Sequence, residues 1–174
     1  ISDLAYADIY FDEAGPPPSI LQVPGARDIA VEFTSLSKSY SMPGWRIGFA
    51  GGPAWLIKAM AKLQSQSTSN PCSISMAATV AALNGDQSFL ADRNAAFVKR
   101  RDLVVSMLNQ TPGLKCPTPE GAFYVYPDCS GLIGKRTPAG AVLESDEDVA
   151  AYLLDAEGVA VVHGAAFGLS PAFR

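Results

Sequence analysis

The segment SLSKSYSMPGWRIGF, residues 35–49, places one lysine and one arginine among serines and glycines in an otherwise apolar stretch. It follows residues 29–36, IAVEFTSL, whose β-branched and aromatic side chains predict a buried strand. Lys38 therefore lies just beyond a strand, where a lysine is either a solvated surface charge or a reactive amine. Arg46, flanked by glycines, offers a planar guanidinium suited to a phosphate or a carboxylate. Other residues of the chain are needed to distinguish a surface charge from a reactive amine.

The composition excludes several classes of protein. The chain has 174 residues, 48% of them hydrophobic and 17% charged, which is typical of a globular fold rather than a disordered segment. A net charge of -4 argues against nucleic acid as a partner, and no apolar run is long enough to span a membrane. Three scattered cysteines favour reduced thiols in a cytoplasm, and the single histidine, His163, excludes a multi-histidine metal site.

Strand and helix signals alternate over the first half of the chain. Three consecutive prolines at 16–18 exclude regular structure there. Trp55 and Leu63 lie on one apolar face of a predicted helix. Besides the strand at 29–36, the expected elements are the end of a strand at 4–12, a strand at 46–50, and helices at 53–67 and 73–84.

The second half opens with a long helix and then becomes richer in loops. Ser145 and Asp148 have the spacing of a capping box, which predicts the start of a helix, and Gly158 predicts its end. The expected elements are a helix at 89–109, two strands within 114–128 joined by a turn at Glu120-Gly121, a helix at 146–157 and a strand at 159–164.

The residues around the lysine have complementary chemistry. Asp3 and Tyr6 follow the first predicted strand with D-x-x-Y spacing. An aspartate beside a heterocyclic nitrogen keeps that nitrogen protonated, and a tyrosine hydroxyl binds a phenolate oxygen. Ser35 and Ser37 add hydroxyl donors to the anion site of the arginine. An amine, a phosphate clamp, a ring-nitrogen partner and a phenol partner are the groups that pyridoxal phosphate requires of a protein.

These motifs resemble the fold-type I aminotransferases of classes I and II, and the resemblance runs in order along the whole chain. The matching segments are Asp3-x-x-Tyr6, Ser35-x-Ser37-Lys38, Gly44-Trp45-Arg46-Ile47-Gly48, Ser69-Asn70-Pro71, Gly121-Ala122-Phe123-Tyr124, and Gly164-Ala165-Ala166-Phe167-Gly168 followed by Arg174. An ordered set of this kind is far more specific than a single lysine motif.

The resemblance implies a role for each site residue. Lys38 would hold pyridoxal phosphate covalently and then carry the proton that moves during the reaction. Asp3 would pair with the ring nitrogen, and Tyr6 would bind the phenolic oxygen. The remaining implied ligands are Ser35 and Arg46 for the phosphate, with Ser37 as a helper, and Arg174 for the α-carboxylate of the amino acid.

The resemblance also implies ping-pong transfer of an amino group between an L-amino acid and a 2-oxo acid, in a homodimer to which the segment around Ser69 and Asn70 contributes. The second half is similar to bacterial aspartate aminotransferases of the subgroup that includes prephenate-active enzymes. The first half is similar to alanine-type or diaminopimelate-type enzymes. We favour aspartate with 2-oxoglutarate, because the small domain faces the substrate. Alanine–glutamate exchange is the close runner-up, and a prephenate- or aromatic-type aminotransferase is a further alternative. An aminotransferase-like sensor domain of a transcription regulator also stays an alternative, since it would keep the same residues.

The predicted fold is therefore α/β, a pyridoxal-phosphate-dependent transferase fold. We expect residues 1–85 to be the C-terminal part of a large, mostly parallel α/β cofactor-binding domain. Residues 86–109 would form a long interdomain helix, and residues 110–174 a small α+β domain. Because the chain begins at Ile1 rather than Met, we expect it to be a fragment of a longer protein.

Overall fold

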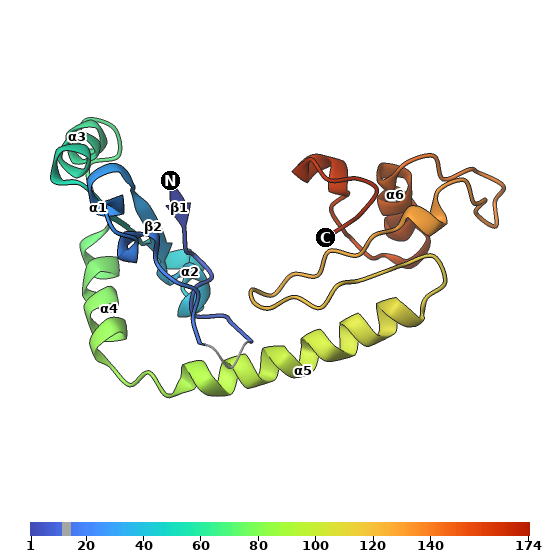
Figure 1. Cartoon of the computed structure of the whole chain (residues 1–174), viewed down its shortest axis with the longest axis horizontal. Coiled ribbons are helices and arrows are strands. Elements are labelled where there is room, and N and C mark those ends of the chain that lie inside the picture. The colour runs from blue at the N-terminus through green and yellow to red at the C-terminus, as the bar shows by residue number, and fades with distance from the viewer. Residues whose placement is uncertain (12–14) are drawn as a thin grey trace. The chain divides into compact units, whose positions relative to one another are not determined.

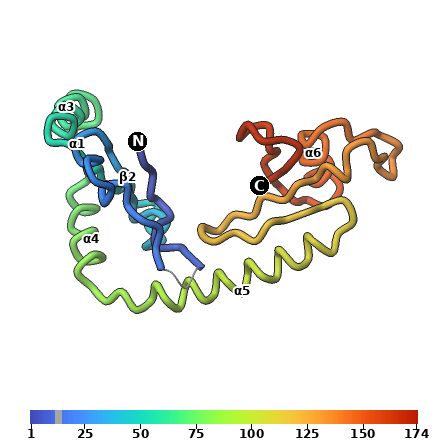
Figure 2. The backbone as a smooth tube through the Cα atoms, in the orientation of Figure 1, coloured from blue at the N-terminus to red at the C-terminus, as the bar shows by residue number. Residues whose placement is uncertain are grey.

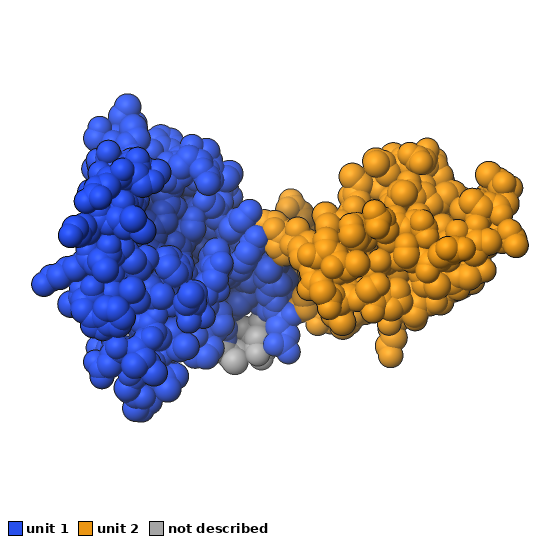
Figure 3. Space-filling model, turned by 90° about the horizontal axis from the view of Figure 1, so that it is seen from above, with its two compact units in different colours: residues 1–95, 120–122 blue, residues 96–119, 123–174 orange. Residues whose placement is uncertain are grey.

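The computed structural model describes residues 1–11 and 15–174 (Figures 1 and 2), so the expected loop residues at 12–14 lie outside the described part. The chain divides into two compact units (Figure 3). Helices and a mixed sheet confirm the predicted α/β class. The functional domains expected at 1–85 and 110–174 stay a prediction. The first unit is Ile1–Ala95 with Glu120–Ala122, and the second is Ala96–Pro119 with Phe123–Arg174.

A three-stranded sheet forms the centre of the first unit. Its strands are β1 (Ser2–Asp3), β2 (Glu32–Ser35) and β3 (Gly48–Gly51), in that order. The central β2 runs parallel to β1 and antiparallel to β3, with Asp3 opposite Phe33 and Ser35 opposite Gly48. The ends of β1 and β2 and the start of β3 therefore meet at one edge of the sheet. Figure 1 shows β1 and β2 next to each other.

The helices predicted for the first half are present. The strand predicted at 29–36 is shorter than expected at both ends. A short helix extends to Ile29 on one side, and on the other the Ser35 hydroxyl accepts a hydrogen bond from the Ser37 N–H and starts a helix at Leu36. The helices are α1 (Ala26–Ile29), α2 (Leu36–Ser39), α3 (Ala54–Ser65), α4 (Ser73–Asn84) and the first turns of α5 (Phe89–Gln110), with 3₁₀ turns η1 (Ile20–Gln22) and η2 (Pro43–Trp45).

The apolar faces of α3 and α4 are not covered by the described residues. Trp55 and Leu63 of α3 are 66% and 73% exposed, and Val80 of α4 is 61% exposed. The predicted periodicity of α3 is therefore present, but no described residue buries that face. No helix of the described residues is long and apolar enough to cross a membrane.

The second unit contains the rest of α5 and α6 (Asp146–Glu157), with 3₁₀ turns η3 (Ser130–Leu132) and η4 (Gly164–Phe167). The predicted capping box of α6 is confirmed, with reciprocal bonds between Ser145 and Asp148, and Gly158 ends the helix at a φ of 67°. The strands predicted within 114–128 and at 159–164 are wrong for the described residues, where extended segments (Figure 2) pair through isolated bridges instead.

A buried carboxylate organises the C-terminal segment. Asp146, at the first position of α6, is only 2% exposed, beside a core formed by Cys129, Leu143, Val149 and Phe173. Its Oδ2 accepts hydrogen bonds from the backbone N–H groups of Ala165, at 3.2 Å, and Ala172, at 3.1 Å. One side chain thus holds both ends of the loop at 165–172.

Burial alone would raise the pKa of the Asp146 carboxyl. The N–H of Ala172, the Ser170 hydroxyl, the N–H of Ala165 and the nearby His163 outweigh burial, so the pKa lies below its ordinary value. A carboxyl whose pKa is lowered by folding stabilises the protein above its unfolded pKa, about 3.9. That contribution is lost as the pH falls through the lower folded pKa.

We expect Asp146→Asn in the full-length protein to lower the free energy of unfolding by about 1–2 kcal/mol at pH 7, because a charged acceptor of two backbone donors is replaced by a neutral one. The difference from the wild type should shrink below about pH 4. Urea unfolding at pH 7 and pH 3 measures both values. Asp155→Asn, on the exposed part of α6, is the control. An equal loss at both pH values would contradict the role of the charge.

Candidate active site

The predicted lysine and tyrosine come together at the edge of the sheet where β1 and β2 end. Asp3 ends β1, and Tyr6 lies in the turn that follows it. Lys38 lies in α2, directly after β2. The Lys38 Nζ is 5.7 Å from the centroid of the Tyr6 ring. Because β1 and β2 are parallel neighbours, segments about thirty residues apart meet at this edge.

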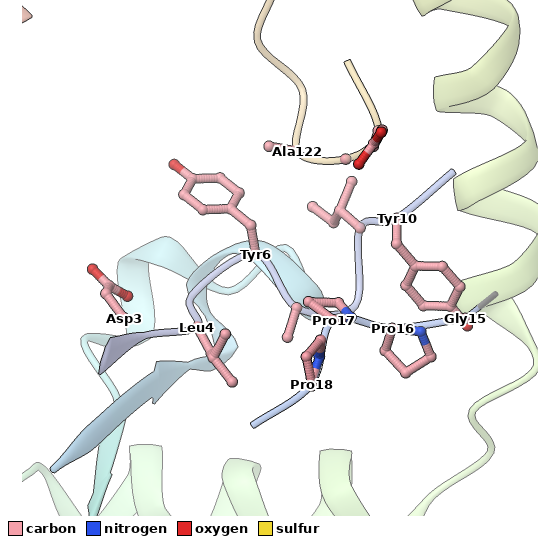
Figure 4. Close-up of a pocket in the computed structure, with 13 residues that line it drawn as sticks. Asp3, Leu4, Tyr6, Tyr10, Gly15, Pro16, Pro17, Pro18 and Ala122 are labelled. Atoms are coloured by element: carbon pink, nitrogen blue, oxygen red, sulfur yellow. The ribbon is translucent and has the colours of Figure 1, made fainter. Parts of the chain in front are cut away.

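Asp3 and Tyr6 line a pocket of about 560 Å³. Figure 4 shows the Asp3 carboxylate and the Tyr6 ring projecting from the same side of the segment that joins them. The orientation of the Asp3 side chain is fixed by a hydrogen bond that its Oδ1 accepts from the Ala5 N–H at 3.0 Å. The pocket is also lined by Tyr10, the prolines at 16–18 and the segment Glu120–Ala122.

The segment Glu120–Ala122 reaches this pocket from a distant part of the sequence. The Ala122 N–H donates to the Ile9 carbonyl at 2.7 Å, and the Phe11 N–H donates to the Glu120 carbonyl at 2.8 Å. A Cβ at Gly121 would lie 2.8 Å from the Ile9 carbonyl oxygen, so only glycine fits there. The motif at 121–124 was noted in the sequence, but nothing in the sequence indicates that it would line this pocket.

A second hollow, of about 240 Å³, lies at the start of β3. Arg46 contributes its guanidinium there from a backbone with a φ of 54°, a left-handed conformation uncommon for a residue other than glycine. Its Nη1 donates to the Pro43 carbonyl at 3.0 Å. Such a conformation is costly unless the surroundings hold it, and it is enriched at functional sites. The hollow is lined by Ser35, Ser37, Arg46, Ile47 and Gly48.

The two serines of this hollow are engaged differently. The Ser35 hydroxyl donates to the Ile47 carbonyl at 2.9 Å and accepts from the Ser37 N–H at 3.1 Å, so it already links β3 to the start of α2. The Ser37 hydroxyl lies 2.9 Å from the Ser35 oxygen. The lining therefore carries two hydroxyls and one guanidinium, with no carboxylate among the described residues, which is the chemistry of an anion site.

A third hollow, of about 460 Å³, connects the arginine to the segment implied to contribute to a dimer. Arg46 and Asn70 both line it, together with Cys72. Asn70 is exposed, and its Nδ2 donates to the Pro71 carbonyl at 3.0 Å. The Ser69-Asn70-Pro71 motif therefore lies near the arginine.

Sequence reasoning missed the support behind Lys38. Arg93 of α5 places Nη1 3.4 Å from the Lys38 carbonyl oxygen, and its guanidinium carbon lies 5.5 Å from the Phe89 ring centroid. Burial lowers the pKa of Arg93, against the opposing effect of the Asp8 carboxylate and Tyr40. Nothing in the sequence distinguishes this arginine from a surface residue of an amphipathic helix.

Arg174 belongs to the second unit and is described within it. Its guanidinium carbon lies 4.5 Å from the centroid of the Tyr124 ring and 4.3 Å from that of Phe167. Its backbone is paired with Val162 in both directions, at 2.8 and 3.0 Å. The two rings come from motifs that were noted in the sequence without a role for either side chain.

Residues 1–174 match the family described as aminotransferase class I and II along the whole chain. The chain belongs to this family. Membership implies pyridoxal phosphate as the cofactor, and the residues of the first unit fit it. Lys38 could supply the amine, the residues of the hollow beside Arg46 could donate to a phosphate, and the Asp3 carboxylate could pair with a ring nitrogen.

The most similar members include two bacterial proteins and a crystal structure. The chain is 55% identical to an aspartate/prephenate aminotransferase of Cereibacter sphaeroides over all 174 residues, and spans 44% of that protein. It is 57% identical over 151 residues to an aspartate aminotransferase of Rhizobium meliloti, spanning 37% of it. The crystal structure of the aspartate aminotransferase from Rhizobium meliloti superimposes with a TM-score of 0.92 at 52% identity, over 97% of this chain and 42% of that one. The chain thus spans less than half of these relatives.

We expect Arg46→Gln in the full-length protein to weaken the binding of pyridoxal phosphate by about tenfold to a hundredfold, because a hydrogen bond between charged groups is lost. Titration of the cofactor-free protein, followed by fluorescence quenching, measures the dissociation constant. Arg27→Gln is the matched control, since Arg27 also donates to one backbone carbonyl, that of Leu21 at 3.1 Å. An unchanged dissociation constant for Arg46→Gln would rule out the phosphate role.

Proposed function

We propose that the full-length protein is a pyridoxal-phosphate-dependent aminotransferase that moves an amino group between L-aspartate and 2-oxoglutarate by a ping-pong mechanism. The observation that carries this proposal is the Lys38 amine, 5.7 Å from the Tyr6 ring centroid at the edge where Asp3 ends β1. The family match supports the reaction class, and the names of the similar proteins support aspartate. Because the chain spans 44% of its relative, the activity is proposed for the whole protein.

The residues of the first unit would hold the cofactor at several atoms. Ser37 and Arg46 would bind the phosphate, and Ser35 would join them by turning its hydroxyl away from the Ile47 carbonyl. The Asp3 carboxylate would keep a ring nitrogen protonated. When bound, the cofactor supplies a carbonyl that accepts the amino group and a ring that delocalises negative charge.

Lys38 would have two tasks in each half-reaction. Its Nζ would attach the resting cofactor and be released when the amino acid arrives. The freed amine would then take the proton from the α-carbon of the amino acid and, with the second substrate, return a proton to the corresponding carbon. The Tyr6 hydroxyl would bind the phenolic oxygen, and Arg174 would bind the substrate α-carboxylate.

A second candidate acceptor is prephenate. The Cereibacter sphaeroides relative, 55% identical to this chain, is named for both aspartate and prephenate. Aspartate and prephenate both carry carboxylates, so Arg174 would bind either one. We further propose that the full-length protein is a homodimer, supported by the exposed segment around Asn70 beside the Arg46 hollow. We also propose that it works in the cytoplasm, where the thiols of its three cysteines would stay reduced.

The deciding experiment follows the absorbance of bound pyridoxal phosphate in the full-length protein. Aspartate should shift the cofactor band, and 2-oxoglutarate should restore it. Recovery with prephenate but not with 2-oxoglutarate would favour the second candidate. A bound cofactor that completes the half-reaction with no amino acid would contradict the enzyme and favour a sensor domain.

We expect Lys38→Ala to reduce transamination roughly a thousandfold or more, because it removes both the covalent attachment and the proton-transferring amine. Oxaloacetate formation from aspartate measures the rate. Lys58→Ala, on the exposed side of α3, is the control and should retain full activity. Substantial turnover by Lys38→Ala would overturn the assignment of this lysine.

A further inference from the structure

The guanidinium of Arg174 is held by aromatic rings. Its carbon lies 4.5 Å from the Tyr124 ring centroid and 4.3 Å from the Phe167 ring centroid. Among the described residues, Arg174 forms no ion pair. A ring attracts a guanidinium through its face, and this attraction does not consume the N–H donors as a carboxylate partner would. The arginine is therefore positioned while its hydrogen-bonding edge stays available to a ligand.

The Phe167 ring has its own support. Phe167 ends η4, and the Tyr126 ring meets it edge-on, with centroids 6.1 Å apart. The Tyr126 hydroxyl donates to the Leu169 carbonyl at 2.8 Å, which ties down the following turn. A Cβ at Gly164 would overlap the Leu169 carbonyl oxygen, so the turn closes only with glycine at that position.

Asp146 holds both the turn that carries Phe167 and the segment that leads to Arg174. Its carboxylate binds the N–H of Ala165, in the turn that carries Phe167, and the N–H of Ala172, two residues before Arg174. Both contacts are made by one side chain that is 2% exposed. The ring and the arginine therefore share one buried anchor.

We propose that Tyr124 and Phe167 are positioning residues that fix the Arg174 guanidinium before a carboxylate binds. The proposal rests on the function proposed above, in which Arg174 binds the substrate α-carboxylate. A long arginine side chain loses considerable rotamer freedom when it is ordered. The rings impose that order in advance, so less binding free energy is lost when the ligand arrives.

The test uses the full-length protein loaded with pyridoxal phosphate. Tyr124→Leu and Phe167→Leu remove the ring faces, whereas Tyr124→Phe and Phe167→Tyr keep them. Leu169→Ala is the control, because its side chain lies in the same loop and is 63% exposed. Three quantities are measured: KM and kcat for aspartate, and the calorimetric dissociation constant of succinate, a dicarboxylate without an amino group.

We expect each leucine variant to raise both KM and the succinate dissociation constant about threefold to tenfold, the range of one cation–π contact. Its kcat should stay within about twofold, since the carboxylate contact is the same in the ground state and the transition state. The ring-keeping variants and Leu169→Ala should stay within about twofold of the wild type in all three quantities.

Two results would overturn the proposal: leucine variants with unchanged succinate binding, or equal losses in the leucine and ring-keeping variants. Phe167 is 45% exposed, so its substitutions should not prevent folding even where those of Tyr124 do. A wild type that binds succinate but never transaminates would refute the proposed function alone. In that case, weaker succinate binding by the leucine variants would still support the ring arrangement.

Discussion

The pairing of β2 with strands on both sides is the constraint on which the candidate cofactor site depends. Parallel pairing aligns Asp3 with Phe33, and antiparallel pairing aligns Ser35 with Gly48. These two registers bring the end of β1, the start of α2 and the residues before β3 to one edge. A shift of one residue in either register would turn every side chain of the shifted strand to the opposite face and separate these groups.

Ser35 links this register to the lysine. Its hydroxyl accepts the Ser37 N–H and donates to the Ile47 carbonyl, so it joins the end of β2, the start of α2 and the entry to β3. Ser35 also lines the hollow beside Arg46. One residue thus contributes to the fold and to the candidate site. Arg46, which directly precedes Ile47, has a φ of 54°. This left-handed conformation is unfavourable for a residue other than glycine.

The sequence predicted the features that depend on neighbours along the chain. The helix α4 follows from an alanine-rich composition and the capping box of α6 from local side-chain bonds, and both are confirmed. The strands predicted at 114–128 and 159–164 failed, because a strand depends on a partner that a single sequence does not identify. In those places isolated bridges and buried polar contacts, above all those of Asp146, hold the backbone.

Contacts between residues distant in the sequence could not be predicted from periodicity either, because a single sequence does not identify the partners. The motifs containing Lys38, Arg46 and Arg174 were visible, because their residue types and spacing are those of a known chemistry. Two contacts were not visible: that of Gly121 with Ile9, more than a hundred residues away, and that of Tyr124 with Arg174. Local spacing identifies the groups that react, whereas the fold alone shows what holds them in place.

The supports of Arg46 and Arg174 leave both cations without a carboxylate partner among the described residues. By contrast, Arg101 on α5 forms an ion pair with Asp102 at 2.8 Å, so its charge already has a partner within the protein. Arg46 is held by a backbone carbonyl and Arg174 by two rings, and neither forms an ion pair with a described residue. A carboxylate partner would have to be displaced before an anion could bind, at the cost of leaving a charge unpaired. Neutral supports avoid that loss, so in the function proposed above Arg46 and Arg174 could bind phosphate and carboxylate without first losing a partner of opposite charge.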